Sequence, residues 1–135
     1  MNREMLFRAK HIHTISGNEH LNGTWVHGYL SDENYIYDKS LEGEFLIDED
    51  TICQYTELTN ELGEEFWEND IVQCGYYYGV IKYEDGAFII KWNTKGSEFL
   101  RHDLAYWAYL RNVRVVGNIF DNPELLEEEN VHGTD

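Results

Sequence analysis

The feature that most constrains the fold of this chain is an Asp85-Gly86 pair between two runs of alternating residues. A two-residue Asp-Gly loop favours a type I′ turn, because glycine adopts positive φ angles freely and aspartate tolerates them. Such a turn fixes how its two strands pair. The pairs on one side are then Tyr83 with Phe88, Ile81 with Ile90 and Gly79 with Trp92, and those on the other side are Lys82 with Ile89 and Val80 with Lys91. A slip of one residue would mix the two sides, so the sequence predicts a hairpin in this register.

The rest of the chain also favours strands. Its 135 residues include ten tyrosines and one proline, and aromatic residues are enriched in strands. Runs between turn residues predict further strands at 6–10, 24–30, 35–37, 45–47, 51–55 and 113–120. Apolar spacing predicts a short helix over 99–111, and Asn122-Pro123-Glu124 is typical of the start of another, ending near Glu128. We expect a mainly β fold, with a partly open barrel or two packed sheets and one or two short helices.

Acidic residues outnumber basic ones by 26 to 10, which gives a net charge of −16. No Lys or Arg occurs from Ser40 to Ile81. The acidic residues of that span are Glu42, Glu44, Asp48, Glu49, Asp50, Glu57, Glu61, Glu64, Glu65, Glu68 and Asp70. Such a surface should repel nucleic acid and attract a basic partner, although solubility is the simpler interpretation. Mutual repulsion is expected to raise some carboxylate pKa values.

Nothing in the sequence indicates a membrane or a secretory route. No window holds the roughly 18 apolar residues that a membrane span needs, and Met1–Arg8 lacks the layout of a signal peptide. Cys53 and Cys74 lie in apolar runs. We expect both to be reduced, with a disulfide between neighbouring strands as the alternative. The expected compartment is therefore the cytoplasm.

Several segments together resemble the YopX proteins of temperate phages and prophages. They are Phe7–Ala9, Ile52–Thr56, Glu68–Val72 and Val116–Leu126. The resemblance implies a compact β-rich fold with an SH3-like or barrel-like element, and it carries no catalytic residue and no cofactor. The family usually has glycine where this chain has Glu57 and Asn69. Asparagine visits positive φ at modest cost, whereas glutamate fits such a position poorly.

We therefore expect one YopX-like domain over residues 1–135. Its parts are variable N-terminal strands over 1–50, a β-rich core over 51–122, and a short helix with a frayed tail over 123–135.

Candidate metal ligands are few. His11, His13 and His20 could bind zinc if Glu19 or Asp48 completed the site,. No familiar zinc-ligand spacing supports this, and surface histidines are the simpler interpretation. We predict no metal and no cofactor.

Candidate catalytic groups are equally weak. His102-Asp103 suggests an acid–base pair, but adjacent residues diverge on a helix. Glu64, Glu65 and Glu68 could act as paired carboxylates,, although charged loops are usually solvated. We predict no catalytic residue, because no constellation of these groups converges.

Aromatic residues are the better indication of function. Phe66 and Trp67 are expected in an acidic loop, and two further clusters, at 76–78 and 106–109, hold more rings than one strand or helix can bury,. The interface candidates are Phe66, Trp67, Tyr76, Tyr77, Tyr78, Tyr106, Trp107 and Tyr109. Tyr and Trp dominate contact energies at interfaces, although these rings could also pack inside their own subunit.

We expect a non-catalytic phage or prophage accessory protein that acts through a protein partner or through self-association into a homo-oligomer. It should bind neither nucleic acid nor membranes directly. The alternative is an acidic mimic of nucleic acid that occupies a basic groove of a host protein.

Overall fold

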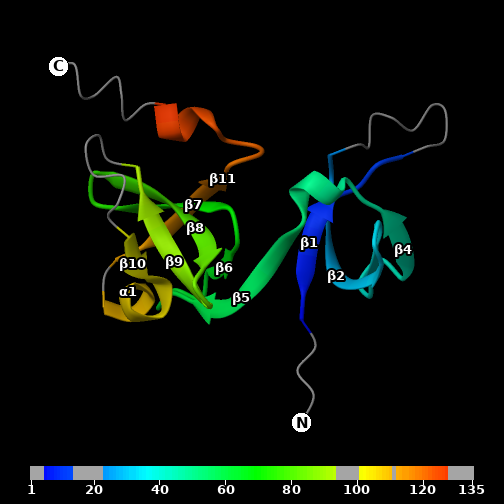
Figure 1. Ribbon diagram of the computed structural model, residues 1–135, viewed down its shortest axis with the longest axis horizontal. Helices are drawn as coiled ribbons and strands as arrows, with labels where there is room; N and C mark the ends of the chain where they lie inside the picture. Colours follow the sequence, from blue (N-terminus) through cyan, green and yellow to red (C-terminus); the bar gives the residue numbers. More distant parts are fainter. Residues whose placement is uncertain (1–4, 14–22, 94–100, 111, 128–135) are drawn as a thin grey trace, which may run out of the picture. The chain divides into compact units, whose positions relative to one another are not determined.

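The computed structural model describes residues 5–13, 23–93, 101–110 and 112–127 (Figure 1). The chain divides into two compact units, Met1–Tyr55 and Thr56–Asp135. The strands form two antiparallel sheets, of six strands in the order β4-β3-β2-β1-β5-β6 and of five strands in the order β10-β9-β8-β7-β11. The mainly β prediction is confirmed. The single domain with its three parts stays a prediction, and the unit boundary at Tyr55 falls inside the segment expected as its core.

The first unit is a meander of short strands. Its elements are β1 (Phe7–Lys10), β2 (Trp25–Asp32), β3 (Tyr35–Asp38), β4 (Gly43–Leu46), the 3-10 turn η2 (Glu49–Thr51) and the start of β5 (Cys53–Thr59). Alternation along these strands buries a small core of Ala9, Val26, Ile36 and Ile47. The strands predicted at 6–10, 24–30, 35–37 and 51–55 all form. The turn after β2 is shorter than expected, because β2 continues to Asp32.

The sheet of the first unit curls, so that the end of β4 returns to the end of β1. Ile12 N donates to Leu46 O at 2.8 Å, and Asp48 N donates to Lys10 O at 2.8 Å. His11 and Ile47 form an isolated bridge between these bonds. The curl therefore brings the two ends together without closing a barrel among the described residues.

Gly28 marks a close approach of two strands in this unit. A Cβ atom at this position would lie 1.9 Å from the carbonyl oxygen of Tyr37 on β3. A backbone atom cannot rotate away, so only glycine fits here.

The second unit contains the remaining strands and the helix. Its elements are β6 (Glu65–Trp67), β7 (Asp70–Cys74), β8 (Tyr77–Glu84), β9 (Ala87–Trp92), β10 (Arg101–Asp103), α1 (Leu104–Leu110) and β11 (Arg114–Asn118). Residues 124–127 are helical, as the Asn-Pro-Glu sequence predicted. The core of this unit consists of Phe66, Val72, Ile81, Ile90, Trp92, Leu104, Ala108 and Val113.

The hairpin around Asp85-Gly86 is confirmed at every predicted pair. Tyr83 lies opposite Phe88, Ile81 opposite Ile90, and Lys82 opposite Ile89. Asp85 and Gly86 have φ angles of 54° and 84°, as a type I′ turn requires.

The helix predicted over 99–111 is shorter than expected. Residues 94–100 lie outside the described residues, and Arg101–Asp103 form β10, which pairs with β9. Asp103 ends that strand and caps the helix, because its Oδ2 accepts from Tyr106 N at 3.2 Å. Because Arg101–Asp103 pair with β9, they form a strand where the sequence predicted the first turn of the helix.

Two positions expected to require glycine do have positive φ. Glu57 has φ 65° within β5, and Asn69 has φ 71° in the turn before β7. The chain therefore holds glutamate and asparagine in a conformation that most residues avoid.

Candidate functional site

Two of the interface candidates are not on the surface. Phe66 and Trp67 were expected to be available for contact with a partner, but they lie on β6 and are buried. Phe66 belongs to the core of its unit, and Trp67 N donates to Asp70 Oδ2 at 2.8 Å. Strand pairing turned the expected loop into part of a sheet. The alternative, in which the rings pack inside their own subunit, therefore holds for both residues.

Two tyrosines at the turn between β7 and β8 are strongly exposed. Tyr76 is 93% exposed and Tyr77 is 55% exposed. The turn depends on Gly75, which has φ 63°. Tyr78 is half-buried, and its carbonyl oxygen accepts from Asn93 N at 2.8 Å. The rings of Tyr76 and Tyr77 are therefore exposed to solvent, whereas that of Tyr78 is partly covered.

The aromatic residues of α1 divide between its two sides. Tyr106 and Tyr109 are 61% and 63% exposed. Leu104 and Ala108 are buried in the core, and Trp107 packs against it. Three- and four-residue spacing separates these sets, so the helix offers two tyrosine rings to solvent.

His102 is part of an aromatic cluster and does not pair with Asp103. Trp92 Nε1 donates to His102 Nδ1 at 2.6 Å, and the ring centroids of His102 and Trp107 are 4.5 Å apart. On β10, adjacent side chains point to opposite faces. His102 accordingly turns to the tryptophans while Asp103 caps α1, and the two do not form an acid–base pair.

His11 and His13 lie side by side, with ring centroids 3.9 Å apart. His11 Nδ1 donates to Leu46 O at 2.7 Å. His20 and Glu19 lie outside the described residues. Among the residues that the structure describes, no three potential metal ligands converge.

The acidic span from Ser40 to Ile81 is divided between the two units. Several of its carboxylates bind the backbone near them. Asp48 Oδ1 accepts from Asp50 N at 3.1 Å and caps η2, and buried Asp70 accepts from Trp67 N. These carboxylates therefore serve local structure.

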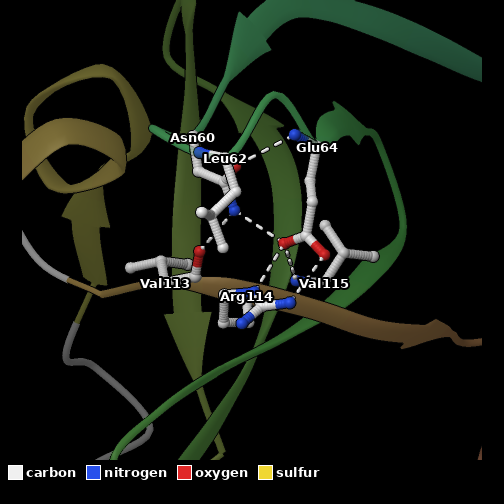
Figure 2. A network of polar contacts seen from close by, with 6 residues as sticks. All are labelled: Asn60, Leu62, Glu64, Val113, Arg114 and Val115. Atoms are coloured by element: carbon white, nitrogen blue, oxygen red, sulfur yellow. Dashed lines mark hydrogen bonds and ion pairs between the residues drawn. The ribbon is translucent and has the colours of Figure 1, made fainter.

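Glu64, a candidate paired carboxylate, is the centre of a polar network (Figure 2). Its Oε1 accepts from Arg114 Nε at 2.9 Å and from Asn60 Nδ2 at 2.6 Å. Asn60 Nδ2 also donates to Val113 O at 3.0 Å, and Asn60 Oδ1 accepts from Leu62 N and Glu64 N. The network ties the turn between β5 and β6 to the start of β11.

The pKa shifts of Glu64 and Arg114 indicate a structural role for this network. Hydrogen bonds from Arg114 lower the pKa of Glu64, burial opposes them, and the Asn60 amide and the Val115 N–H add to the lowering. Glu64 in turn raises the pKa of Arg114. A carboxylate held ionised in this way is a poor general acid at neutral pH.

Asp38 is a second carboxylate with a lowered pKa. Burial alone would raise the pKa, but hydrogen bonds from Ser40, the His27 N–H and the Leu41 N–H outweigh it. Its Oδ1 accepts from Ser40 Oγ at 2.6 Å. Both lowered pKa values, of Asp38 and of Glu64, run against the expected rise from mutual repulsion.

Comparison with known families agrees with the β-rich architecture and the sequence segments above. The family model described as YopX protein matches residues 6–127, which is most of the chain. Among curated proteins, none matches the sequence. Within the described residues, helices are too short or too polar to cross a membrane.

Proposed function

Because the chain belongs to the YopX family, we propose that it is a non-catalytic accessory protein of a phage or prophage, acting through protein–protein contact. The partner is another protein or a second copy of this chain. The observation that carries the proposal is the exposure of four tyrosines in the second unit. They are Tyr76, Tyr77, Tyr106 and Tyr109.

Rigid, exposed tyrosines are suited to contact. Fully burying a large apolar side chain contributes about 1.5–3 kcal/mol, and Tyr76 is 93% exposed. A tight turn and a helix already fix the backbone of these residues, so the entropy lost on binding is mainly that of the side chains. Tyrosine is also enriched among residues that dominate interface energies.

The absence of catalysis is also part of the proposal. The best candidate groups are engaged in structural bonds: His102 with Trp92, and Glu64 with Arg114. The net charge of −16 supports the proposal that the protein does not bind nucleic acid directly. We place it in the cytoplasm, supported by the free thiols of Cys53 and Cys74,.

The test compares oligomeric state and partner capture between variants. Tyr76→Ser/Tyr109→Ser should weaken self-association in light scattering, or the capture of a specific host protein by the immobilised chain. Tyr83→Ser is the matched control, because Tyr83 is 53% exposed and lies outside this set. A monomeric wild-type protein that captures nothing would overturn the proposal, as would an equal loss in the control.

A further inference from the structure

Three tyrosines of the first unit share one side of its sheet. Tyr29 on β2 lies opposite Tyr37 on β3, and Tyr35 precedes Tyr37 by two residues on the same strand. Ile36, between them, is fully buried, so the side chains of β3 alternate between core and solvent,. The three rings are 36%, 39% and 39% exposed for Tyr29, Tyr35 and Tyr37. They form a continuous group on the outer side of the sheet.

The surroundings of these rings are acidic. Glu44 on β4 lies opposite Tyr37, and Asp32 lies opposite Tyr35. Asp32, Glu33, Glu42 and Glu44 are all exposed. Residues 29–46 contain five acidic residues and one basic residue, Lys39. We call the side chains of Tyr29, Tyr35, Tyr37 and Glu44 the tyrosine face.

An aromatic ring on the same side of this sheet already binds cations within the chain. The guanidinium of Arg8 lies 4.8 Å from the ring centroid of Trp25, and Lys10 Nζ lies 5.6 Å from it. In the strand register Lys10 is opposite Trp25 and Arg8 is opposite His27. Cations over aromatic rings are therefore compatible with the geometry of this surface.

We propose that the tyrosine face binds an arginine-rich segment of a partner protein. The inference rests on the proposed function, and it adds the chemistry of the partner and a surface on the other unit. A guanidinium stacks flat on a tyrosine ring while its N–H groups reach a carboxylate such as Glu44. Lysine carries the same charge but lacks this planar fork, so arginine should be preferred. The net charge of −16 would steer such a segment toward the protein.

The test measures fluorescence anisotropy of a labelled arginine–glycine repeat peptide, with a lysine–glycine peptide of equal length as comparison. At about 0.15 M salt, where exposed charges are screened beyond roughly 8 Å, we expect the arginine peptide to bind about tenfold more tightly. Tyr35→Ser/Tyr37→Ser should remove most of this difference. Tyr35→Phe/Tyr37→Phe, which keeps the rings, should retain the affinity within about threefold.

The controls separate a specific surface from general attraction to an acidic protein. Tyr83→Ser, on β8 of the other unit, should leave peptide affinity unchanged. Circular dichroism identifies any variant that fails to fold. Glu44→Gln, which removes an exposed carboxylate of the tyrosine face, then carries the test, because it should weaken binding of the arginine peptide. Equal affinity for both peptides, no binding, or an equal loss in Tyr83→Ser would overturn the inference.

Failure here is distinguishable from failure of the proposed function. If no peptide binds while Tyr76→Ser/Tyr109→Ser still disrupts association or capture, only the proposal that the tyrosine face binds arginine is wrong. If the arginine peptide binds specifically while the protein neither associates nor captures a partner through the second unit, the contact assigned to that unit is wrong.

Discussion

Replacing Glu57 by glycine should stabilise the protein relative to replacing it by alanine. Glu57 has φ 65°, and a residue with a Cβ in this region loses about 1–2 kcal/mol. Glycine avoids that cost but loses roughly 0.5–1 kcal/mol more than alanine in backbone entropy. The middle of the two ranges gives a net gain of about 0.75 kcal/mol for Glu57→Gly over Glu57→Ala. Both variants remove the carboxylate, so comparing them isolates the backbone.

The bend at Glu57 should survive both substitutions, because its neighbours hold it. Thr56 Oγ1 donates to Phe66 O at 2.7 Å and accepts from Leu58 N at 3.1 Å. Since these bonds do not involve the Glu57 side chain, the two variants should retain the positive φ angle. The gain from glycine should therefore appear in the free energy of unfolding and not be lost to local rearrangement.

The assay is urea unfolding followed by tryptophan fluorescence and circular dichroism. Glu65 on β6 supplies the control, because it is an exposed glutamate whose φ is not positive. There the order should reverse, with Glu65→Gly less stable than Glu65→Ala by about 0.5–1 kcal/mol. If glycine is the worse residue at both positions, the reasoning from the left-handed conformation of Glu57 is refuted.

Three further predictions address packing, hydrogen bonding and charge. Gly28→Ala should destabilise the first unit by about 1–3 kcal/mol in urea unfolding, whereas Gly43→Ala, whose Cβ would meet only ordinary contacts at 3.7 Å or more, should not. Asn60→Ala should cost about 1–3 kcal/mol, because it removes the partner of several backbone groups,. Lowered pKa values at Asp38 and Glu64 mean that their stabilisation is complete above the ordinary values of 3.8 and 4.5 and is lost as pH falls through the folded values,. Thermal melting should show this loss on the acid side, and Asp38→Asn or Glu64→Gln should reduce it; an acid-side loss that is unchanged in both variants would contradict it.

Local chemistry was enough to predict the hairpin and most strands. The register around Asp85-Gly86 follows from the φ angles of two adjacent residues, and the structure has every predicted pair. The helix boundary did not follow from local pattern, because Arg101–Asp103 pair with β9. Phe66 was misplaced for the same reason, since its burial depends on core residues that come later in the chain.

The candidate sites were less predictable than the fold. The polar network joins Asn60 to Val113, which are 53 residues apart, and no short motif marks that pairing. The tyrosine face becomes visible only when the register places Tyr29 opposite Tyr37. The exposed rings of Tyr76 and Tyr109, in contrast, belong to clusters that the sequence already showed to be too rich in aromatic residues to bury completely.

The acidic character of the chain has two physical roles that composition alone does not separate. Carboxylates such as Asp38, Asp48 and Asp70 accept backbone N–H bonds and stabilise turns and strand entries. Glutamates such as Glu42 and Glu44 are exposed and contribute to the field of the whole molecule. That field acts at long range and raises the encounter rate with a cationic partner, whereas contact energy comes from buried area and stacking. In an acidic protein with exposed tyrosines, the negative charge therefore speeds the encounter and the rings supply contact energy. An arginine-rich segment, as we propose, is a partner that would gain from both effects.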